Sequence, residues 1–390
     1  MAVNRHMGRI ILLMICLTLL SACGQAPGNS ELPFVTRAAD EGYSYDAPNR
    51  IDAENQNEKI KLLFHADVTV PQTDGFTVQK VERRLYDAED YRAVATALCP
   101  DAIWKTEGGE LYDWASPLPD ERICLFAETP DGRTAQFIMD VPNLSFSFRF
   151  GTLYFLAERH CESEEELSAF NSEATISVET AYEAAMEALA LLGLKDYDAC
   201  ISDRVVGFDD GEAAADGWQF VMTRRCDSLL QPFYEGYTAW DYGDPPQMTS
   251  PWGMEYLYVT VTREGLQSVS GMRLGEQTEL VAQDFILLPF DKVLSAITSQ
   301  LEAQHGLNGV TEPASDWTVE IYSIRLGCAL VSFAAGNEGY CIPAWFVEYR
   351  LSSTNTASGS VLTTEENSAF SAIDGSYIQP FMTPDAEGVQ

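Results

Sequence analysis

The chain has 390 residues and a formal net charge of −35 at pH 7, from 24 basic and 59 acidic side chains. Phosphate backbones and anionic lipid headgroups repel a body of this charge, so the composition argues against nucleic acid as a partner and against direct adsorption to a membrane. With 46% hydrophobic and 11% aromatic residues, the chain has the composition of a folded protein, and its length suggests two or three domains.

Residues 1–22 predict a secretory signal peptide. Arg5 and Arg9 precede an apolar run over residues 10–20, and the small residues Ser21 and Ala22 follow it. The run is shorter than the roughly 20 residues that a transmembrane helix needs. No other part of the sequence has 18 consecutive apolar residues, so we expect no membrane-spanning helix elsewhere.

The four residues 20–23, Leu-Ser-Ala-Cys, resemble the lipobox of bacterial lipoproteins. The resemblance implies that the chain is cut before Cys23 and that the Cys23 thiol carries diacylglycerol, with acyl chains such as palmitate. Several acyl chains on one residue anchor a protein durably. We therefore expect a lipoprotein of the cell membrane that faces outside the cytoplasm. The alternatives are an ordinary cleaved signal peptide or an uncleaved anchor.

Apart from Cys16 and Cys23, the sequence contains seven cysteines, at positions 99, 124, 161, 200, 226, 328 and 341. No two of them have the C-x-x-C spacing of zinc-ribbon or thioredoxin-type sites. Seven is odd, so not all of them can pair within the chain. Some disulfides are expected in an exported protein and other cysteines are expected to be buried thiols, but the pairing cannot be derived from the sequence.

The tether and the first folded region follow the signal peptide. Residues 23–56 are rich in turn-forming and charged residues without apolar periodicity, which predicts a flexible tether. Region 57–172 is predicted to be an α+β domain. Its expected elements are a strand over 62–70, a helix from the Asp87 cap to Leu98, a hairpin over 123–141 turning at Asp131-Gly132, and a strand over 144–150.

The two later regions, 173–280 and 281–390, each begin with a helix and continue with strands. The first is expected to have a helix capped by Ser177 and ended by Gly193, and strands over 198–206, 218–225, 255–262 and from 266 onward. The second is expected to have a helix over 289–305 and strands over 317–328, 340–351 and 369–378. Pro343 suggests that its strand is an edge strand or carries a bulge.

Strands that follow one another through short turns predict an α+β fold with antiparallel sheets and a few helices. The order of one helix followed by a β-meander occurs in both later regions, which suggests a repeated unit. The sequence match between the two is short, WQFV at 218–221 against WFV at 345–347.

Several stretches of the chain resemble a family of uncharacterised lipoproteins from clostridia and other Firmicutes, for which no activity is assigned. The stretches that carry the resemblance are residues 63–71, 250–265, 288–297, 324–333, 341–349 and 371–378. The chain departs from the family pattern at Gly253-Met254-Glu255, where a proline is expected before the glutamate. The helix-plus-meander units are also similar to PepSY-type and YycH-type extracytoplasmic modules, which implies a regulatory or inhibitory role.

The residues that most often carry catalysis give no catalytic arrangement in this sequence. His65 lies on the outward face of a predicted strand, and His305 lies at a helix end, where a cation suits the helix dipole. His160 and Cys161 are adjacent, and neighbours on a strand point to opposite faces. The sequence also lacks the G-x-S-x-G, HExxH and P-loop motifs. We therefore expect no catalytic residue, no enzymatic activity and no cofactor, although a pair of carboxylates among 59 acids stays open.

Two acidic clusters are candidates for calcium sites, which need several oxygen ligands on a loop. They are Glu162 with Glu164, Glu165 and Glu166, and Asp209 with Asp210, Glu212 and Asp216. The second cluster does not have the EF-hand spacing. We expect both clusters to be solvated acidic surface and predict no metal site.

The long loop 233–258 is the candidate binding site, with Tyr234, Tyr237, Trp240, Tyr242 and Trp252 as its candidate residues. Exposed rings beside carboxylates suit the faces of sugars or basic, aromatic peptides. The alternative is that these rings cover a sheet. We expect a non-catalytic binding or regulatory protein of the cell envelope with a protein partner. The alternatives are a solute-binding lipoprotein of a transporter and a carboxylate-dependent envelope hydrolase.

Overall fold

The computed structural model describes residues 45–56, 60–73, 75–84, 88–105, 122–129, 132–140, 145–170, 173–209, 212–234, 248–249, 255–306, 315–332 and 337–379. These residues belong to one compact unit that extends from Thr36 to Gln390. Cys23 and the predicted signal peptide lie outside the described residues. Within the described ranges, no helix has the length and apolar character needed to cross a bilayer.

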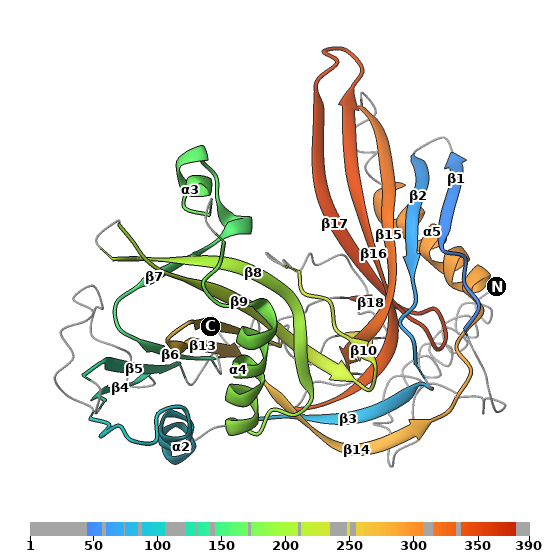
Figure 1. Cartoon of the computed structure of the whole chain (residues 1–390). Coiled ribbons are helices and arrows are strands. Elements are labelled where there is room, and N and C mark those ends of the chain that lie inside the picture. The colour runs from blue at the N-terminus through green and yellow to red at the C-terminus, as the bar shows by residue number, and fades with distance from the viewer. Residues whose placement is uncertain are drawn as a thin grey trace, which may run out of the picture. The chain divides into compact units, whose positions relative to one another are not determined.

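The described residues form two nine-stranded sheets in which most neighbouring strands run antiparallel (Figure 1). We call the first the terminal sheet, because most of its strands come from the two ends of the chain. Its order is β1-β2-β15-β16-β17-β18-β11, and β3 pairs with both β14 and the start of β16. The strands are β1 (Arg50–Gln56), β2 (Lys61–Thr69), β3 (Thr77–Arg83), β11 (Met248–Thr249), β14 (Gly275–Gln283), β15 (Ser315–Val331), β16 (Glu338–Asn355), β17 (Val361–Ser371) and β18 (Tyr377–Gln379).

We call the second sheet the central sheet. Its order is β4-β5-β6-β13-β12-β9-β8-β7, and β10 pairs with β9. The strands are β4 (Arg122–Glu128), β5 (Thr134–Asp140), β6 (Ser145–Phe150), β7 (Tyr154–Ala157), β8 (Tyr197–Asp209), β9 (Glu212–Cys226), β10 (Leu229–Leu230), β12 (Tyr256–Thr262) and β13 (Gly265–Met272). The prediction of an α+β fold built on antiparallel sheets is therefore confirmed.

The described helices are few. They are α2 (Ala88–Leu98), α3 (Glu164–Ser168), α4 (Val178–Leu191), α5 (Phe290–Gly306) and the 3-10 helix η1 (Glu158–His160). The Ser177 hydroxyl accepts a hydrogen bond from the Thr180 backbone N–H and begins α4. Gly193, at φ +69°, ends it. Both predictions for this helix are confirmed, and α4 packs on β9, β12 and β13.

The buried faces of the strands follow the alternation in the sequence. In β2 the residues Leu62, Phe64, Ala66 and Val68 are buried while His65 and Asp67 are exposed. In β6 the buried residues are Phe146, Phe148 and Phe150. The predicted hairpin over 123–141 is also present as β4 and β5. Apolar alternation therefore identified these strands correctly.

The folded part begins earlier than predicted. The tether was expected to reach residue 56, but residues 50–56 form β1, which pairs antiparallel with β2. The Tyr45 hydroxyl donates to the Leu288 carbonyl at 2.7 Å, and the Tyr45 ring lies 5.6 Å from that of Trp345. The prediction failed because β1 is an edge strand of mostly exposed polar residues, so its backbone pairing leaves no apolar pattern in the sequence.

The two sheets do not follow the predicted regions along the chain. Region 57–172 supplies β2 and β3 to the terminal sheet and β4 to β7 to the central sheet. Region 173–280 supplies β14 to the terminal sheet. Sheet membership is decided by pairing between distant segments, which local sequence patterns do not report.

The C-terminal strands differ from the prediction in two respects. The strand expected over 369–378 is two strands, β17 and β18, separated by a turn with Gly375 at φ +80°. The prediction that Pro343 marks an edge strand or a bulge is wrong, because β16 is a central strand. Pro343 lies where the neighbour of β16 changes from β3 to β17, and its carbonyl accepts a hydrogen bond from Ala372. A missing N–H is tolerated at such a change of partner.

Candidate functional site

Of the candidate loop 233–258, the structure describes residues 233–234, 248–249 and 255–258. Of the five candidate residues it describes Tyr234, whereas Tyr237, Trp240, Tyr242 and Trp252 lie outside the described residues. The loop leaves the central sheet after β9 and β10, contributes β11 to the terminal sheet, where it pairs parallel with β18, and returns to the central sheet at β12. The residues around these two ends therefore define the base of the loop.

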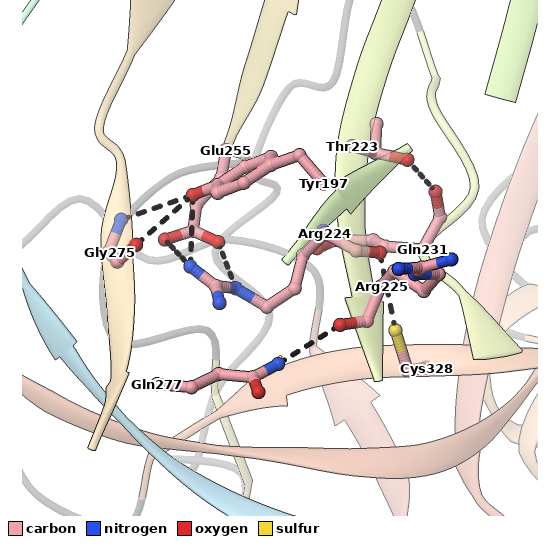
Figure 2. Close-up of polar contacts among 9 residues, drawn as sticks. All are labelled: Tyr197, Thr223, Arg224, Arg225, Gln231, Glu255, Gly275, Gln277 and Cys328. Atoms are coloured by element: carbon pink, nitrogen blue, oxygen red, sulfur yellow. Dashed lines mark hydrogen bonds and ion pairs between the residues drawn. The ribbon is translucent and has the colours of Figure 1, made fainter. Parts of the chain in front are cut away.

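A buried ion pair joins the two ends of the loop. Arg224, near the end of β9, donates from Nε to Glu255 Oε2 at 2.5 Å and from Nη2 to Glu255 Oε1 at 3.0 Å (Figure 2). Both side chains are fully buried. Glu255 immediately precedes β12. The paired hydrogen bonds match the fork of the guanidinium to the carboxylate, which fixes both distance and orientation. We call this ion pair the clamp.

Two further residues make hydrogen bonds next to the clamp, Tyr197 at the start of β8 and Gly275 in β14. Arg224 Nη2 donates to the Tyr197 hydroxyl oxygen at 2.9 Å, and the Gly275 backbone N–H donates to the same oxygen at 3.2 Å. A Cβ atom at Gly275 would lie 2.7 Å from Glu255 Oε1, so only glycine fits there. Since β14 belongs to the terminal sheet, the Tyr197 hydroxyl links the clamp in the central sheet to the terminal sheet (Figure 2).

The Arg224 guanidinium keeps its charge although it is buried. Burial alone would lower the pKa of the Arg224 guanidinium, but Glu255 and Tyr197 outweigh that effect and hold the pKa well above its usual value. An ion pair in this environment depends on both partners, because removing one leaves the other as an uncompensated buried charge.

The residues that lead into the loop are fixed to the scaffold next to the clamp. The Gln231 backbone N–H donates to the Arg224 carbonyl at 2.8 Å, and the Thr223 hydroxyl donates to the Gln231 carbonyl. A Cβ atom at Gly327 in β15 would lie 2.5 Å from the Leu230 carbonyl oxygen. The segment that enters the loop therefore lies directly against a strand of the terminal sheet.

Aromatic rings gather at the base of the loop. The Phe233 ring makes edge-to-face contacts with Tyr256 at 5.2 Å and with Tyr258 at 5.9 Å, and these two tyrosines are 5.3 Å apart. Tyr234 lies 6.2 Å from Phe346 in β16. The Phe233 ring therefore packs against two rings of β12, and the Tyr234 ring lies beside one ring of β16.

Tyr234 is the candidate residue whose surroundings are known. Burial raises the pKa of its hydroxyl, and the nearby Glu348 carboxylate raises it further, while Arg325 acts in the opposite direction. Arg325 Nη2 donates to Glu348 Oε1 at 3.0 Å. Tyr234 is therefore a neutral hydrogen-bonding group held beside an Arg–Glu pair, which suits positioning of the loop and does not suit proton transfer at pH 7.

The exposed histidines form no nucleophile–base pair. His65 faces Glu320, with 3.5 Å between Nδ1 and Oε1. His160 lies in η1 and not in a strand, and its Nε2 accepts a hydrogen bond from Arg159. The Cys161 thiol points to the Ala157 carbonyl, and burial together with Glu166 and Glu158 raises its pKa. A thiol in this position stays protonated and is a poor nucleophile.

His305 lies in the last turn of α5, as predicted, but it is not a cation there. His305 is buried, and its Nε2 lies 3.0 Å from the Tyr349 hydroxyl, which donates to Glu366 at 3.1 Å. Burial lowers the pKa of His305 to about 4. The imidazole is therefore neutral at pH 7 and serves as a hydrogen-bonding group inside the fold.

In each acidic cluster, one carboxylate accepts hydrogen bonds from backbone N–H groups. Glu166 accepts from the backbone N–H groups of Glu162 and Ser163, which lowers its pKa and completes a capping box at α3. Asp216 accepts from the Thr175 N–H and hydroxyl. Among the described residues, no group of three or more histidine, cysteine or acidic side chains is arranged to hold a metal ion.

A hollow of about 420 Å³ lies at the end of α2. The Arg133 guanidinium covers the Phe150 ring there, 4.1 Å from its centroid. The hollow is lined by Leu98, Cys99, Pro100, Asp101, Thr129, Arg133, Phe150, Glu264 and Leu266. Its volume falls within the range of sites for small ligands.

Comparison with known proteins assigns no family to the chain. No protein-family model matches the chain. No curated protein matches it either. Among solved structures, the chain is similar to an uncharacterised protein from Eubacterium rectale, with 13% identity and a TM-score of 0.48 over 85% of this chain and 93% of that one. This similarity carries no argument about function.

The sequence-based search missed the clamp, although a signal for it was present. In residues 218–226, Phe220, Met222 and Arg224 occupy alternate positions and are all buried. An arginine in phase with buried apolar residues of a strand must find a buried partner. The identity of that partner, Glu255, could not be derived because the register between β9 and β12 was unknown.

Proposed function

We propose that the protein is a lipid-anchored lipoprotein outside the cytoplasm, related to the uncharacterised clostridial family, that binds and regulates a protein of the cell envelope through the loop 233–258. The observation that carries the proposal is the clamp, which holds both ends of an aromatic-rich loop on a rigid sheet. Long irregular loops on a rigid scaffold are typical of binding sites.

The base of the loop favours binding over catalysis. The described residues around it are packed rings and hydrogen-bonded ion pairs, and the thiols and histidines of the described chain have other partners or lie elsewhere. Holding a loop at both ends lowers the conformational entropy that is lost when a partner orders it. Aromatic side chains in such a loop supply contact area with little further loss of entropy.

The proposed lipid anchor at Cys23 lies about 20 residues before the first described contact of the folded part. Tyr45 is already bound to the body of the protein, which leaves the segment from Cys23 to that point as a spacer. Fully extended, this spacer would reach about 70 Å. The net charge of −35 repels an anionic leaflet, so the lipid would be the attachment and the body would stand off the membrane.

Mass spectrometry of the native protein tests the anchor. The N-terminal peptide is expected to begin at Cys23 and to carry diacylglycerol, and the Cys23→Ser variant is expected to leave the membrane fraction or to keep its uncleaved signal peptide. An unmodified cysteine, or a wild-type protein found in the cytosol, would contradict this part of the proposal.

Crosslinking in intact cells tests the binding site. We expect the wild-type protein to enrich one envelope protein and a variant with alanine at Tyr237, Trp240, Tyr242 and Trp252 to lose at least about tenfold of that signal, as expected for loss of central aromatic anchors. The matched control is Tyr154→Ala, since Tyr154 is 67% exposed in β7. Equal enrichment by the loop variant, or the absence of any enriched partner, would contradict the proposal.

We also propose that the two helix-plus-meander units are structural repeats. The order α4-β8-β9-β12-β13 and the order α5-β15-β16-β17-β18 support this, because each set of strands pairs in chain order. The short sequence match supports it as well, since WQFV falls in β9 and WFV in β16, the second strand of each unit.

Binding of a small solute is the second candidate function, and the hollow at the end of α2 favours it. A screen of thermal stability against sugars, peptides and metal ions distinguishes the two candidates. A ligand that raises the melting temperature of the wild type but not of an Arg133→Ala variant would favour solute binding.

A further inference from the structure

Three buried cysteines meet where the two sheets contact one another. Cys226 is the last residue of β9 in the central sheet, while Cys328 in β15 and Cys341 in β16 belong to the terminal sheet. Cys226 is 2% exposed and the other two are fully buried. All three are free thiols in this structure, and the side chains of Cys226 and Cys328 each interact with that of Cys341. We call these residues the thiol cluster.

Further contacts fix the thiol cluster in the scaffold. Cys226 Sγ lies 3.4 Å from the Thr77 hydroxyl oxygen in β3. The Cys328 thiol donates to the backbone carbonyl of Arg224 at 3.5 Å (Figure 2). The thiol cluster therefore contacts the backbone of Arg224, the residue whose side chain forms the clamp at the base of the aromatic loop.

The strand register decides which thiols can be joined. Cys328 is opposite Pro343 and Cys341 is opposite Leu330, so the two cysteines are diagonal neighbours on adjacent strands. The Cα atoms of diagonal neighbours are about 7–8 Å apart. A disulfide usually needs Cα atoms about 4.4–6.8 Å apart. The ladder between β15 and β16 therefore disfavours a disulfide between Cys328 and Cys341. No ladder restricts Cys226, which approaches Cys341 from the other sheet.

We propose that Cys226 and Cys341 form a disulfide that covalently joins the central sheet to the terminal sheet. The oxidant is a disulfide, supplied by a thiol–disulfide oxidoreductase or a small disulfide such as oxidised glutathione. One protein thiolate attacks this disulfide and releases the first thiol, and the second protein thiolate then displaces the other. Two protein thiols are oxidised to one disulfide, and one disulfide is reduced to two thiols.

The environment of the thiols places the reaction during folding. In the folded protein, hydrogen bonding to Cys341 and burial raise the pKa of Cys226, and the pKa of Cys341 is also raised. Exchange requires a thiolate, so buried protonated thiols exchange slowly. The disulfide therefore forms before the two sheets close over it, and it then resists reduction in the native protein.

This inference does not depend on the binding partner or on the loop. The disulfide would close a segment of about 115 residues, and cross-links over long segments restrict the unfolded chain most strongly. It would also fix the strand that carries Arg224, two residues before Cys226, to the terminal sheet. The base of the aromatic loop would then keep its position during partial opening of the sheets.

Peptide mapping of the full-length protein tests the assignment. The protein is denatured, refolded with a mixture of oxidised and reduced glutathione, and then denatured again with N-ethylmaleimide present and no reductant. We expect a linked pair of peptides containing Cys226 and Cys341, with Cys328 alkylated. Alkylation of both Cys226 and Cys341 before reduction, or a link between either of them and another cysteine, would overturn the proposal.

Variants provide a second test that does not need the linked peptide. Dithiothreitol during refolding is expected to lower the melting temperature of the wild type and of Cys328→Ser by roughly 5 °C. It is expected to leave that of Cys226→Ser unchanged. A loss of the dithiothreitol effect in Cys328→Ser but not in Cys226→Ser would overturn the proposal, and the peptide map of the wild type decides the matter if Cys226→Ser does not fold.

Discussion

At the scale of single residues, His305 is a buried neutral group in contact with two others. Its Nε2 lies 3.0 Å from the Tyr349 hydroxyl and 3.8 Å from Glu366 Oε2. Tyr349 is fully buried, while the Glu366 side chain is 33% exposed. The Tyr349 hydroxyl uses its proton in the hydrogen bond to the Glu366 carboxylate. The neutral His305 ring must therefore carry its own proton on Nε2 and donate it to the hydroxyl oxygen.

This arrangement predicts a loss of stability in mild acid. Burial lowers the pKa of His305 from 6.5 to about 4, so the unfolded state binds the proton more readily between these values. The free energy of unfolding is therefore expected to fall by up to about 3 kcal/mol as the pH drops from 6.5 to 4. Urea unfolding of the wild type and of His305→Gln, measured across this range, checks the difference.

The matched control is His65→Gln, because His65 is exposed on β2. The control is expected to keep the pH dependence of the wild type, while His305→Gln is expected to show a shallower one. Identical slopes for the wild type and His305→Gln would show that His305 does not supply the effect.

Replacing one residue of the clamp is expected to cause a large loss of stability. Glu255→Gln leaves the buried Arg224 charge uncompensated, which is expected to cost about 3–5 kcal/mol in the free energy of unfolding. Glu338→Gln is the control, since Glu338 pairs with Lys80 at the surface and exposed pairs contribute about 1 kcal/mol or less. Urea unfolding at pH 7 measures both variants, and a loss for Glu255→Gln as small as the control's would contradict the role of the clamp.

At the scale of elements, the cap of α4 is a measurable contribution. Ser177→Ala removes the hydroxyl that accepts from the Thr180 N–H and is expected to cost about 1 kcal/mol, whereas Ser177→Asp retains an acceptor and is expected to cost less. Ser295→Ala within α5 is the control, because the Ser295 hydroxyl bonds only the carbonyl of the preceding turn. Thermal unfolding of the three variants ranks them.

The elements that could be predicted from the sequence carry their signal locally. The alternation in β2 and β6, the cap and the stripe of α4, and the turn between β4 and β5 depend on neighbours within a few residues. The strands β1, β3 and β14 were not predicted, because β1 and β14 expose mostly polar side chains and all three are held by partners far along the chain.

The candidate site was also predictable from the sequence only where its signal is local. The aromatic content of the loop and its position between two strands were evident in the sequence, whereas the clamp depends on the register that brings β9 next to β12. The thiol cluster depends on contact between the two sheets. No spacing of the cysteines along the chain distinguishes Cys226 and Cys341 from the other five.

At the scale of the whole molecule, the charge of −35 predicts a response to salt. Repulsion among excess carboxylates destabilises the compact state, and salt screens it. The urea midpoint at pH 7 is therefore expected to rise as sodium chloride increases from about 20 mM to about 500 mM. Potassium chloride is expected to have the same effect, because screening depends on ionic strength, and a fall in the midpoint would contradict the explanation.

The parallel pairing of β2 with β15 has a consequence for synthesis and truncation. Lys61 is opposite Thr318, so an early strand of the chain has its inner neighbour near the other end. A nascent chain emerges from its N-terminus, and β2 must wait with one side unpaired until the last quarter of the polypeptide has left the ribosome. Shortened products that stop before residue 315 would present Leu62, Phe64 and Val68 to quality-control proteases, so even distal nonsense mutations are expected to remove the entire protein.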